Sequence, residues 1–174
     1  MKKLVAAVPL ALAAALLVAP PAVADDRRCT GTIKAASIDD NVVVPSGATC
    51  RLVGTRVDGN VFVNRNATLV ARGVKVGGNI QAENHERVVV RPRKVDDRVI
   101  RSRVGGSIQL VQGGGGRLLR NVVGSDIQLF SNDGQFEVRR NRVDGNLQCK
   151  SNSPRPVGGG NVVEGNKEDQ CRGL

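Results

Sequence analysis

A short alternation of apolar and polar residues recurs along most of this chain. The segment Val-Asp-Gly-Asn-Val-Phe-Val at 57–63 shows the pattern: one apolar residue, two small turn-forming residues, one short polar residue, and then an apolar–variable–apolar run. Alternation with a period of two is typical of a β-strand that buries one face. Seven copies of this signature begin at Ile38, Val57, Val76, Val104, Val123, Val143 and Val163.

The spacing of the copies indicates a repeat architecture. Successive copies start 19, 19, 28, 19, 20 and 20 residues apart, and a nearly fixed period of about twenty residues is typical of a solenoid. A second strand-like run, such as 87–90, and a shorter third run, such as 72–76, lie between copies. We therefore predict an all-β, single-domain parallel β-helix with a triangular cross-section and about seven turns. We expect the right-handed form because parallel crossovers usually have that hand.

Two signature positions are polar in most turns. Short polar side chains stacked turn upon turn can form a hydrogen-bonded ladder along one corner of the solenoid. The fourth position supplies this predicted corner ladder, which consists of Asn41, Asn60, Asn79, Ser107, Asp126, Asn146 and Asn166. The sixth position is glutamine in four consecutive copies and should point outward, at Gln81, Gln109, Gln128 and Gln148.

The start of the chain has a different character. Two lysines, an apolar run over 4–18 and Ala22-Val23-Ala24 predict a cleaved secretory signal at 1–24 and a β-helix domain at 25–174. Removing Lys2 and Lys3 with that signal lowers the formal charge from +10 to +8. Three Phe and no Trp or Tyr leave little material for stacking on bases or sugars. Specific nucleic-acid binding is therefore not expected.

The four cysteines fit an exported chain, in which disulfides persist. Of three possible connectivities we favour Cys29–Cys50 and Cys149–Cys171, because each pair lies at one end of the chain about twenty residues apart. These bridges would fix the two ends, including a C-terminal cap at 164–174. No C-x₂-C spacing occurs and no His lies beside a Cys, so we expect neither a metal site nor a cofactor.

The longest interval contains a basic insertion near 91–103. Insertions in solenoids form loops on one face, and arginine binds phosphate, sulfate or carboxylate through a planar fork of donors. The alternative is a solvated loop in which Asp96 and Asp97 pair with neighbouring cations. The candidate binding residues of this insertion are Arg91, Arg93, Lys94, Arg98, Arg101 and Arg103.

Stacking predicts a second group of cations. The residue before the signature is basic in four copies, at Arg56, Lys75, Arg103 and Arg142. Two residues earlier lie Arg101, Arg120 and Arg140, and we expect both sets on the same side of the rod. An extended polyanion would neutralise such a column of cations. The alternative is that these arginines only protect strand edges and maintain solubility.

Features that could suggest an enzyme have simpler interpretations. The acidic residues at the second signature position are expected to serve the turns, and they are Asp39, Asp58, Asp144 and Glu164. We expect His85 to be an exposed loop residue and Gly113–Gly116 to form a permissive turn.

Two segments carry a resemblance to known proteins. The pattern Asn-Val-Val-Val-Pro-Ser-Gly-Ala-Thr-Cys at 41–50 and the terminal Gly-Asn-Lys-Glu-Asp-Gln-Cys at 165–171 resemble a group of small secreted actinobacterial β-helix proteins of unassigned function. The likeness extends over the whole mature chain. The turn pattern more loosely resembles bactofilins, which polymerise, but the cysteines and the charged C-terminal end differ from them. The resemblance implies a β-helix fold and transfers no catalytic residue.

These observations favour a secreted, non-enzymatic β-solenoid at the cell surface or in the extracellular space. Its expected partner is an anionic polymer, such as an acidic polysaccharide or another anionic cell-envelope polymer, bound through the basic face. A self-associating structural module is the main alternative, because strand edges and a glutamine ladder can pair with other copies. A polysaccharide-cleaving β-helix enzyme is a weaker alternative, since short turns build few walls around a substrate.

Overall fold

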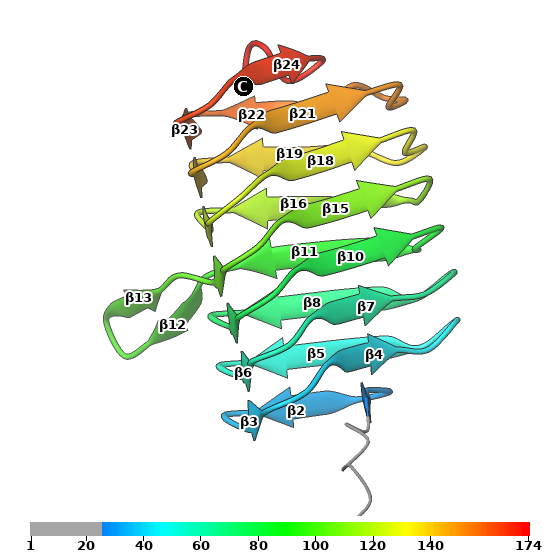
Figure 1. The fold of residues 1–174 in the computed structure, drawn as a ribbon, viewed down its shortest axis with the longest axis vertical. Coiled ribbons are helices and arrows are strands. Elements are labelled where there is room, and N and C mark those ends of the chain that lie inside the picture. The colour runs from blue at the N-terminus through cyan, green and yellow to red at the C-terminus, as the bar shows by residue number, and fades with distance from the viewer. Residues whose placement is uncertain (1–25) are drawn as a thin grey trace, which may run out of the picture.

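The computed structural model describes residues 26–174, which coil into a right-handed parallel β-solenoid (Figure 1). Toward the C-terminus, the front strands run to the right and the strands behind them run to the left while the chain rises. Three parallel sheets form the sides of the rod. The predicted fold class is confirmed, although the solenoid has about eight turns rather than seven. The difference arises from Arg27–Arg28 (β1), which pairs with Val42–Val43 but carries no signature.

Sheet A contains the strands that the signatures predicted. Its eight strands are, in spatial order, β1, β4 (Val42–Val44), β7 (Val61–Val63), β10 (Ile80–Glu83), β15 (Ile108–Val111), β18 (Ile127–Phe130), β21 (Leu147–Lys150) and β24 (Lys167–Asp169).

Sheets B and C form the other two sides. Sheet B contains the longer middle strands β2 (Thr32–Lys34), β5 (Thr49–Val53), β8 (Thr68–Arg72), β11 (Arg87–Arg91), β16 (Gly115–Leu119), β19 (Phe136–Arg139) and β22 (Val157–Gly159). Sheet C contains two-residue strands, which are β3 (Ser37–Ile38), β6 (Arg56–Val57), β9 (Lys75–Val76), β14 (Arg103–Val104), β17 (Val122–Val123), β20 (Arg142–Val143) and β23 (Val162–Val163).

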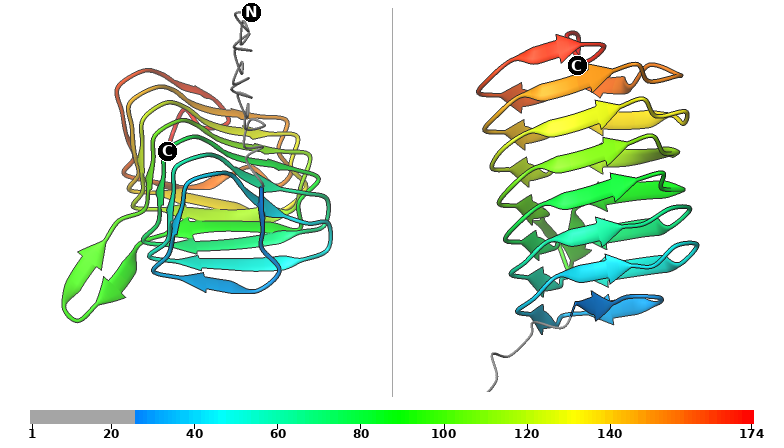
Figure 2. Two further views of the ribbon diagram at one scale, coloured as in Figure 1. Left: turned by 60° about the horizontal axis from the view of Figure 1, so that its bottom comes forward. Right: turned by 45° about the vertical axis from the view of Figure 1, so that its right-hand side comes forward.

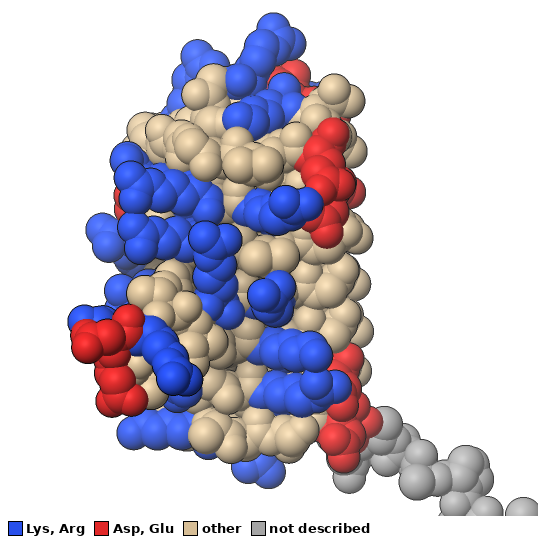
Figure 3. Space-filling model, turned by 90° about the vertical axis from the view of Figure 1, so that its left-hand side faces the viewer, with Lys and Arg blue, Asp and Glu red and all other residues tan. Residues whose placement is uncertain are grey.

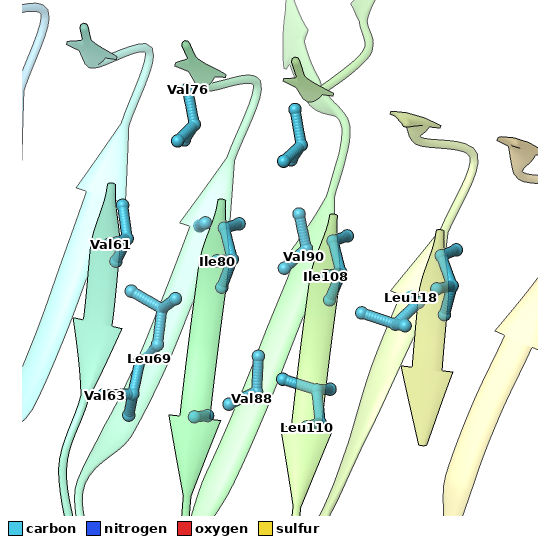
Figure 4. Close-up of a cluster of buried hydrophobic side chains, with 14 of the residues drawn as sticks. Val61, Val63, Leu69, Val76, Ile80, Val88, Val90, Ile108, Leu110 and Leu118 are labelled. Carbon is cyan, nitrogen blue, oxygen red and sulfur yellow. The ribbon is translucent and has the colours of Figure 1, made fainter. Parts of the chain in front are cut away.

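The core is a set of aliphatic columns inside the coil (Figure 4). In sheet A, Val61, Ile80 and Ile108 are register partners on successive strands and are fully buried. Leu69 and Val88 stack in the same way in sheet B. β-Branched and leucine side chains fill this narrow interior well. The apolar positions of the signature therefore supply the packing of every turn.

Hydrogen bonds connect the corner ladder from turn to turn. The Oδ1 atom of Asn41 accepts bonds from the backbone N–H of Asn60 at 2.8 Å and from its side-chain amide at 3.1 Å. Asn79 makes the same contacts with Asn60. Equivalent backbone donations continue through Ser107, Asp126, Asn146 and Asn166. The corner polar groups thereby satisfy backbone donors that the turns leave unpaired.

Two further ladders, which sequence analysis does not predict, lie in the interior. Asn121, Asn141 and Asn161 are at most 5% exposed. The side-chain amide of Asn121 donates to the Oδ1 atom of Asn141, and that of Asn141 donates to the Oδ1 atom of Asn161. The Asn141 amide also donates to the Leu118 carbonyl at 2.8 Å. Asn132, Asn152 and Gln170 form the second interior ladder. Because buried amides must keep partners, each member depends on the turn beside it.

Both ends carry the predicted disulfides. Cys29–Cys50 fixes the first turn and has a Cα–Cα distance of 5.4 Å. Cys149–Cys171 ties the C-terminal turn to β21 at a Cα–Cα distance of 5.2 Å. All four sulfurs belong to buried residues of the core, so the bridges extend the apolar columns to the ends. The disulfides are consistent with an oxidising environment.

The extra length of the third interval forms a β-hairpin rather than an irregular loop. Strands β12 (Arg93–Val95) and β13 (Arg98–Ile100) pair antiparallel and project from the rod (Figure 2). The Ser102 hydroxyl donates to the Arg91 carbonyl at 2.8 Å and closes the base of the hairpin. The solenoid register resumes at Arg103, which pairs with Lys75.

The Gly113–Gly116 segment is not the permissive turn that we expected. Gly115 and Gly116 belong to β16, and a Cβ atom on Gly116 would lie 1.9 Å from the Val88 carbonyl oxygen. A Cβ atom on Gly113 would lie 2.2 Å from Nδ1 of His85. Close packing between turns therefore requires these glycines.

We predict that Asn141→Ala lowers the free energy of unfolding by about 3 kcal/mol, because the neighbouring buried amides lose a partner. Denaturant titration of the oxidised protein measures this loss. Asn166→Ala is the matched control at the exposed end of the corner ladder and should cost less than about 1 kcal/mol. Equal losses in the two variants would show that the interior ladder has no special role.

Candidate anion-binding surface

Sheet C presents the predicted column of cations. Arg56 pairs in register with Lys75, and Lys75 pairs with Arg103; all three are exposed. Val122 interrupts the column before Arg142. Figure 3 shows this side of the rod, where Lys and Arg are widespread and Asp and Glu gather mainly along one edge and on a protrusion. The column therefore exists on one side, as expected.

Carboxylates of the corner neutralise part of this column. A guanidinium nitrogen of Arg56 lies 2.7 Å from a carboxylate oxygen of Asp58. Arg142 pairs with Asp144 at 3.5 Å and also with Glu164. These pairs are exposed, so each contributes little to stability, but each reduces the net positive charge of sheet C. Acidic residues at the second signature position thus form ion pairs with arginines that precede the signatures.

The second predicted set lies elsewhere. Arg120 and Arg140 occupy the corner between sheets B and C, with φ of 53° and 56°, instead of the outer face of sheet C. The middle strands end there, and the corner needs a left-handed residue to turn the chain. Arg101 is exposed at the end of the hairpin. The two sets therefore do not share one face, contrary to the expectation from stacking.

The hairpin residues differ in their surroundings. Arg93 is half-buried, and its side chain lies over Gly54 and Gly73, where added Cβ atoms would lie within 2.6 and 2.7 Å of it. Lys94 forms an ion pair with Asp97 at 3.5 Å, as the solvated-loop alternative expects. Arg98 is exposed on β13. The hairpin thus carries both signs of charge.

A group of four arginines lies on the outer face of sheet B. Arg72 and Arg91 are register partners on β8 and β11, Arg87 lies at the other end of β11, and Arg117 follows on β16. We call Arg72, Arg87, Arg91 and Arg117 the arginine cluster. Among the described residues, Arg117 alone of the four has a carboxylate within 4 Å, which is that of Glu137 at 3.5 Å.

The arginine cluster surrounds an apolar floor. Val70 and Val89 are register partners at outward positions of their strands. Although it lies on the outer face, Val89 is only 8% exposed. Together with the four arginines they line one shallow depression. Burial lowers the pKa of Arg91, and the positive charges of Arg72 and Arg117 lower it further. The register of the strands therefore places repelling positive charges beside Arg91.

A second depression continues the positive surface along the rod. It shares Arg91 with the first and is lined further by Pro92, Leu119, Arg120, Glu137, Arg139 and Arg140. Glu137 is its carboxylate and pairs with Arg139 at 3.4 Å. Of the predicted residues, Arg91 thus belongs to the arginine cluster, and Arg120 and Arg140 lie beside it.

The candidate binding residues predicted from sequence do not include four arginines on this side, namely Arg72, Arg87, Arg117 and Arg139. Each lies on a middle strand at an outward position, where its neighbours along the strand are buried. The sequence contains a signal for them, because polar and apolar residues alternate in these strands. It could have been found by aligning the middle strands by their distance from each signature, because that alignment places Arg72 beside Arg91.

His85 is buried, contrary to our expectation of an exposed loop residue. Its side chain is packed above Gly113 and makes an edge-on contact with Phe136, with ring centroids 6.1 Å apart. Only 2% of the residue is exposed, and neither ring nitrogen has a hydrogen-bond partner among the described residues. Burial lowers the pKa of His85 to about 4, and the nearby carboxylate of Asp133 partly opposes the shift.

Some other kinds of site have no support in the described part of the chain. Residues 26–174 contain no cluster of three or more His, Cys, Asp or Glu side chains that could hold a metal ion. Nor does any helix among these residues have the length and apolar character needed to cross a membrane. Comparisons with protein-family models, curated proteins and solved structures gave no match.

We predict that the stability of the protein falls as the pH drops from 6.5 to 4, because unfolding lets His85 take up a proton at its ordinary pKa. The stabilisation is complete above pH 6.5. The loss at pH 4 relative to pH 7 should be about 3 kcal/mol larger in the wild type than in His85→Leu. Denaturant titrations at the two pH values measure the difference, and a parallel loss in both proteins would contradict the buried neutral imidazole.

Proposed function

We propose that this protein is a secreted, non-enzymatic β-solenoid that binds an anionic polymer at the cell surface or in the extracellular space. The predicted secretory signal at 1–24 lies outside the described residues, and the two disulfides fit the proposed location. The observation that carries the proposal is the arginine cluster. Arg72, Arg87 and Arg91 have no carboxylate partner within 4 Å among the described residues.

Arginines that are fixed on a scaffold and have no carboxylate partner favour an anionic ligand. Burial lowers the pKa of Arg91, and repulsion by Arg72 and Arg117 lowers it further. That repulsion would be relieved when a phosphate, sulfate or carboxylate group lies between the guanidinium groups. Rigid strands hold the bases of these side chains, so less conformational entropy is lost on binding. Val89 beneath the cluster contributes an apolar floor against which the arginine stems pack.

A polymer suits the surface better than a single small anion. The cluster extends over three adjacent strands, β8, β11 and β16, and the second depression extends to β19. With strands about 4.8 Å apart, this surface is roughly 15 Å long along the rod. Several regularly spaced charges on one flexible chain can contact such a surface together and release their counterions.

We expect the affinity for dextran sulfate, used as the probe, to fall linearly with the logarithm of salt concentration. The double variant Arg72→Gln/Arg91→Gln should lower the magnitude of the salt slope by about two, since each arginine that contacts the polymer contributes about one. Titration calorimetry in a salt series measures both values.

The matched control is Arg56→Gln/Arg142→Gln, which removes the same formal charge from sheet C, where both arginines already have carboxylate partners. Its slope should change by less than half as much. Binding that is independent of salt would overturn the proposal. Equal effects of the two double variants would show that net charge, rather than the arginine cluster, governs binding.

Self-association is a second candidate, favoured by one observation at the C-terminal end. Val157 on β22 is 49% exposed and Val162 on β23 is 60% exposed, and both strands are the last of their sheets. Unpaired strand edges with exposed apolar side chains favour contact with another copy. Sedimentation of the oxidised protein across concentration tests this candidate: a monomer throughout would exclude it, and loss of association in Val162→Lys would support it.

A further inference from the structure

The outer face of sheet A differs from the basic sides of the rod. One column along this face starts at Arg28 on β1, continues in direct register through Val43, Phe62 and the four glutamines, and ends at Glu168. The members between these two ends are half-buried and uncharged; they are Val43, Phe62, Gln81, Gln109, Gln128 and Gln148. The cations that dominate sheets B and C are therefore nearly absent from the centre of this face.

Hydrogen bonds fix the glutamine amides. Gln81 donates from Nε2 to Oε1 of Gln109 at 2.7 Å, and Gln109 donates in the same way to Gln128 at 2.9 Å. The series continues through Gln148 to the carboxylate of Glu168. A primary amide has two N–H donors and an oxygen with two lone pairs. Each bond in the ladder uses one N–H, so an ordered row of donors and acceptors remains at the surface.

A depression lies beside Phe62 at the start of this row. It has a volume of about 520 Å³, within the roughly 300–1,000 Å³ typical of ligand sites. Its lining combines one aromatic ring, amides and one carboxylate, and contains no Lys or Arg: Phe62, Val63, Asn64, Gln81, Ala82, Glu83, Gln109 and Val111. This composition does not suit an anionic ligand.

We infer that this depression binds a neutral sugar residue of a glycan. The apolar C–H face of a pyranose ring would lie on Phe62, since aromatic rings contribute a large apolar contact area of fixed geometry. Sugar hydroxyls both donate and accept, which matches the fixed amides of Gln81 and Gln109. The carboxylate of Glu83 accepts hydrogen bonds from hydroxyls and would repel acidic sugars.

This inference does not depend on the proposed function, because the depression and the arginine cluster lie on different sheets. If both hold, one rod would contact a neutral glycan through sheet A and an anionic polymer through sheet B. Two such sites on one rigid scaffold would connect two polymers of an extracellular matrix. Few aromatic residues are needed for this arrangement, since Phe62 alone provides the ring.

The test is a titration of the isotope-labelled, oxidised protein with three neutral probes, which are cellohexaose, maltohexaose and chitohexaose. We expect at least one probe to shift the side-chain amide resonances of Gln81 and Gln109 in a saturable manner at millimolar concentration. Phe62→Ala should weaken that affinity about tenfold. Phe130→Ala is the matched control, because Phe130 is half-buried on sheet A but lies outside the lining.

Three results would overturn the inference. These are the absence of shifts with all three probes, equal weakening by the two Phe variants, and amide shifts that depend on protein concentration without any sugar. The last result would assign the face to self-association. Dextran sulfate binding by the Phe62→Ala variant separates the two proposals, because it should equal that of the wild type whatever the sugars do.

Discussion

Parallel pairing between successive turns places each residue about 4.8 Å from its counterpart in the next turn, and the rest of the structure depends on this register. In the core, aliphatic residues pack against aliphatic residues of the next turn, as Val61, Ile80 and Ile108 do. A buried amide is tolerated because the next turn presents another amide, as between Asn121 and Asn141. Slipping by one residue would expose the apolar columns and bury the polar ones, so the register is strongly specified.

The same register explains the concentration of charge. Arg72 and Arg91 lie side by side because they hold equivalent positions on adjacent turns, not because they attract. Where the next turn supplies a carboxylate, as Glu137 does beside Arg117, the repulsion is relieved within the chain. Where it does not, the scaffold maintains a positive surface whose electrostatic energy an external anion can lower. Sheet A follows the opposite rule, since its stacked glutamines satisfy one another.

Much of the fold could be predicted from sequence, because the signature marks one strand and one corner in each turn. The pairing of Cys29 with Cys50, for example, was predicted from their spacing and their place at one end of the chain. The middle strands lack a signature, so their outward arginines form a pattern only when these strands are aligned by their distance from each signature. His85 could not be placed from its own segment, because the space for its ring comes from Gly113 in the next turn. The hairpin, too, arises from pairing within an insertion that the repeat does not describe.

The claim that the arginine cluster contacts an anionic polymer is tested most directly by chemical footprinting. Arginine modification with phenylglyoxal, measured by peptide mass spectrometry with and without dextran sulfate, reports which guanidinium groups the polymer covers. Our account predicts stronger protection of Arg72, Arg87 and Arg91 than of Arg56 and Arg142. Protection that is uniform over these five residues, or strongest on Arg56 and Arg142, would contradict it.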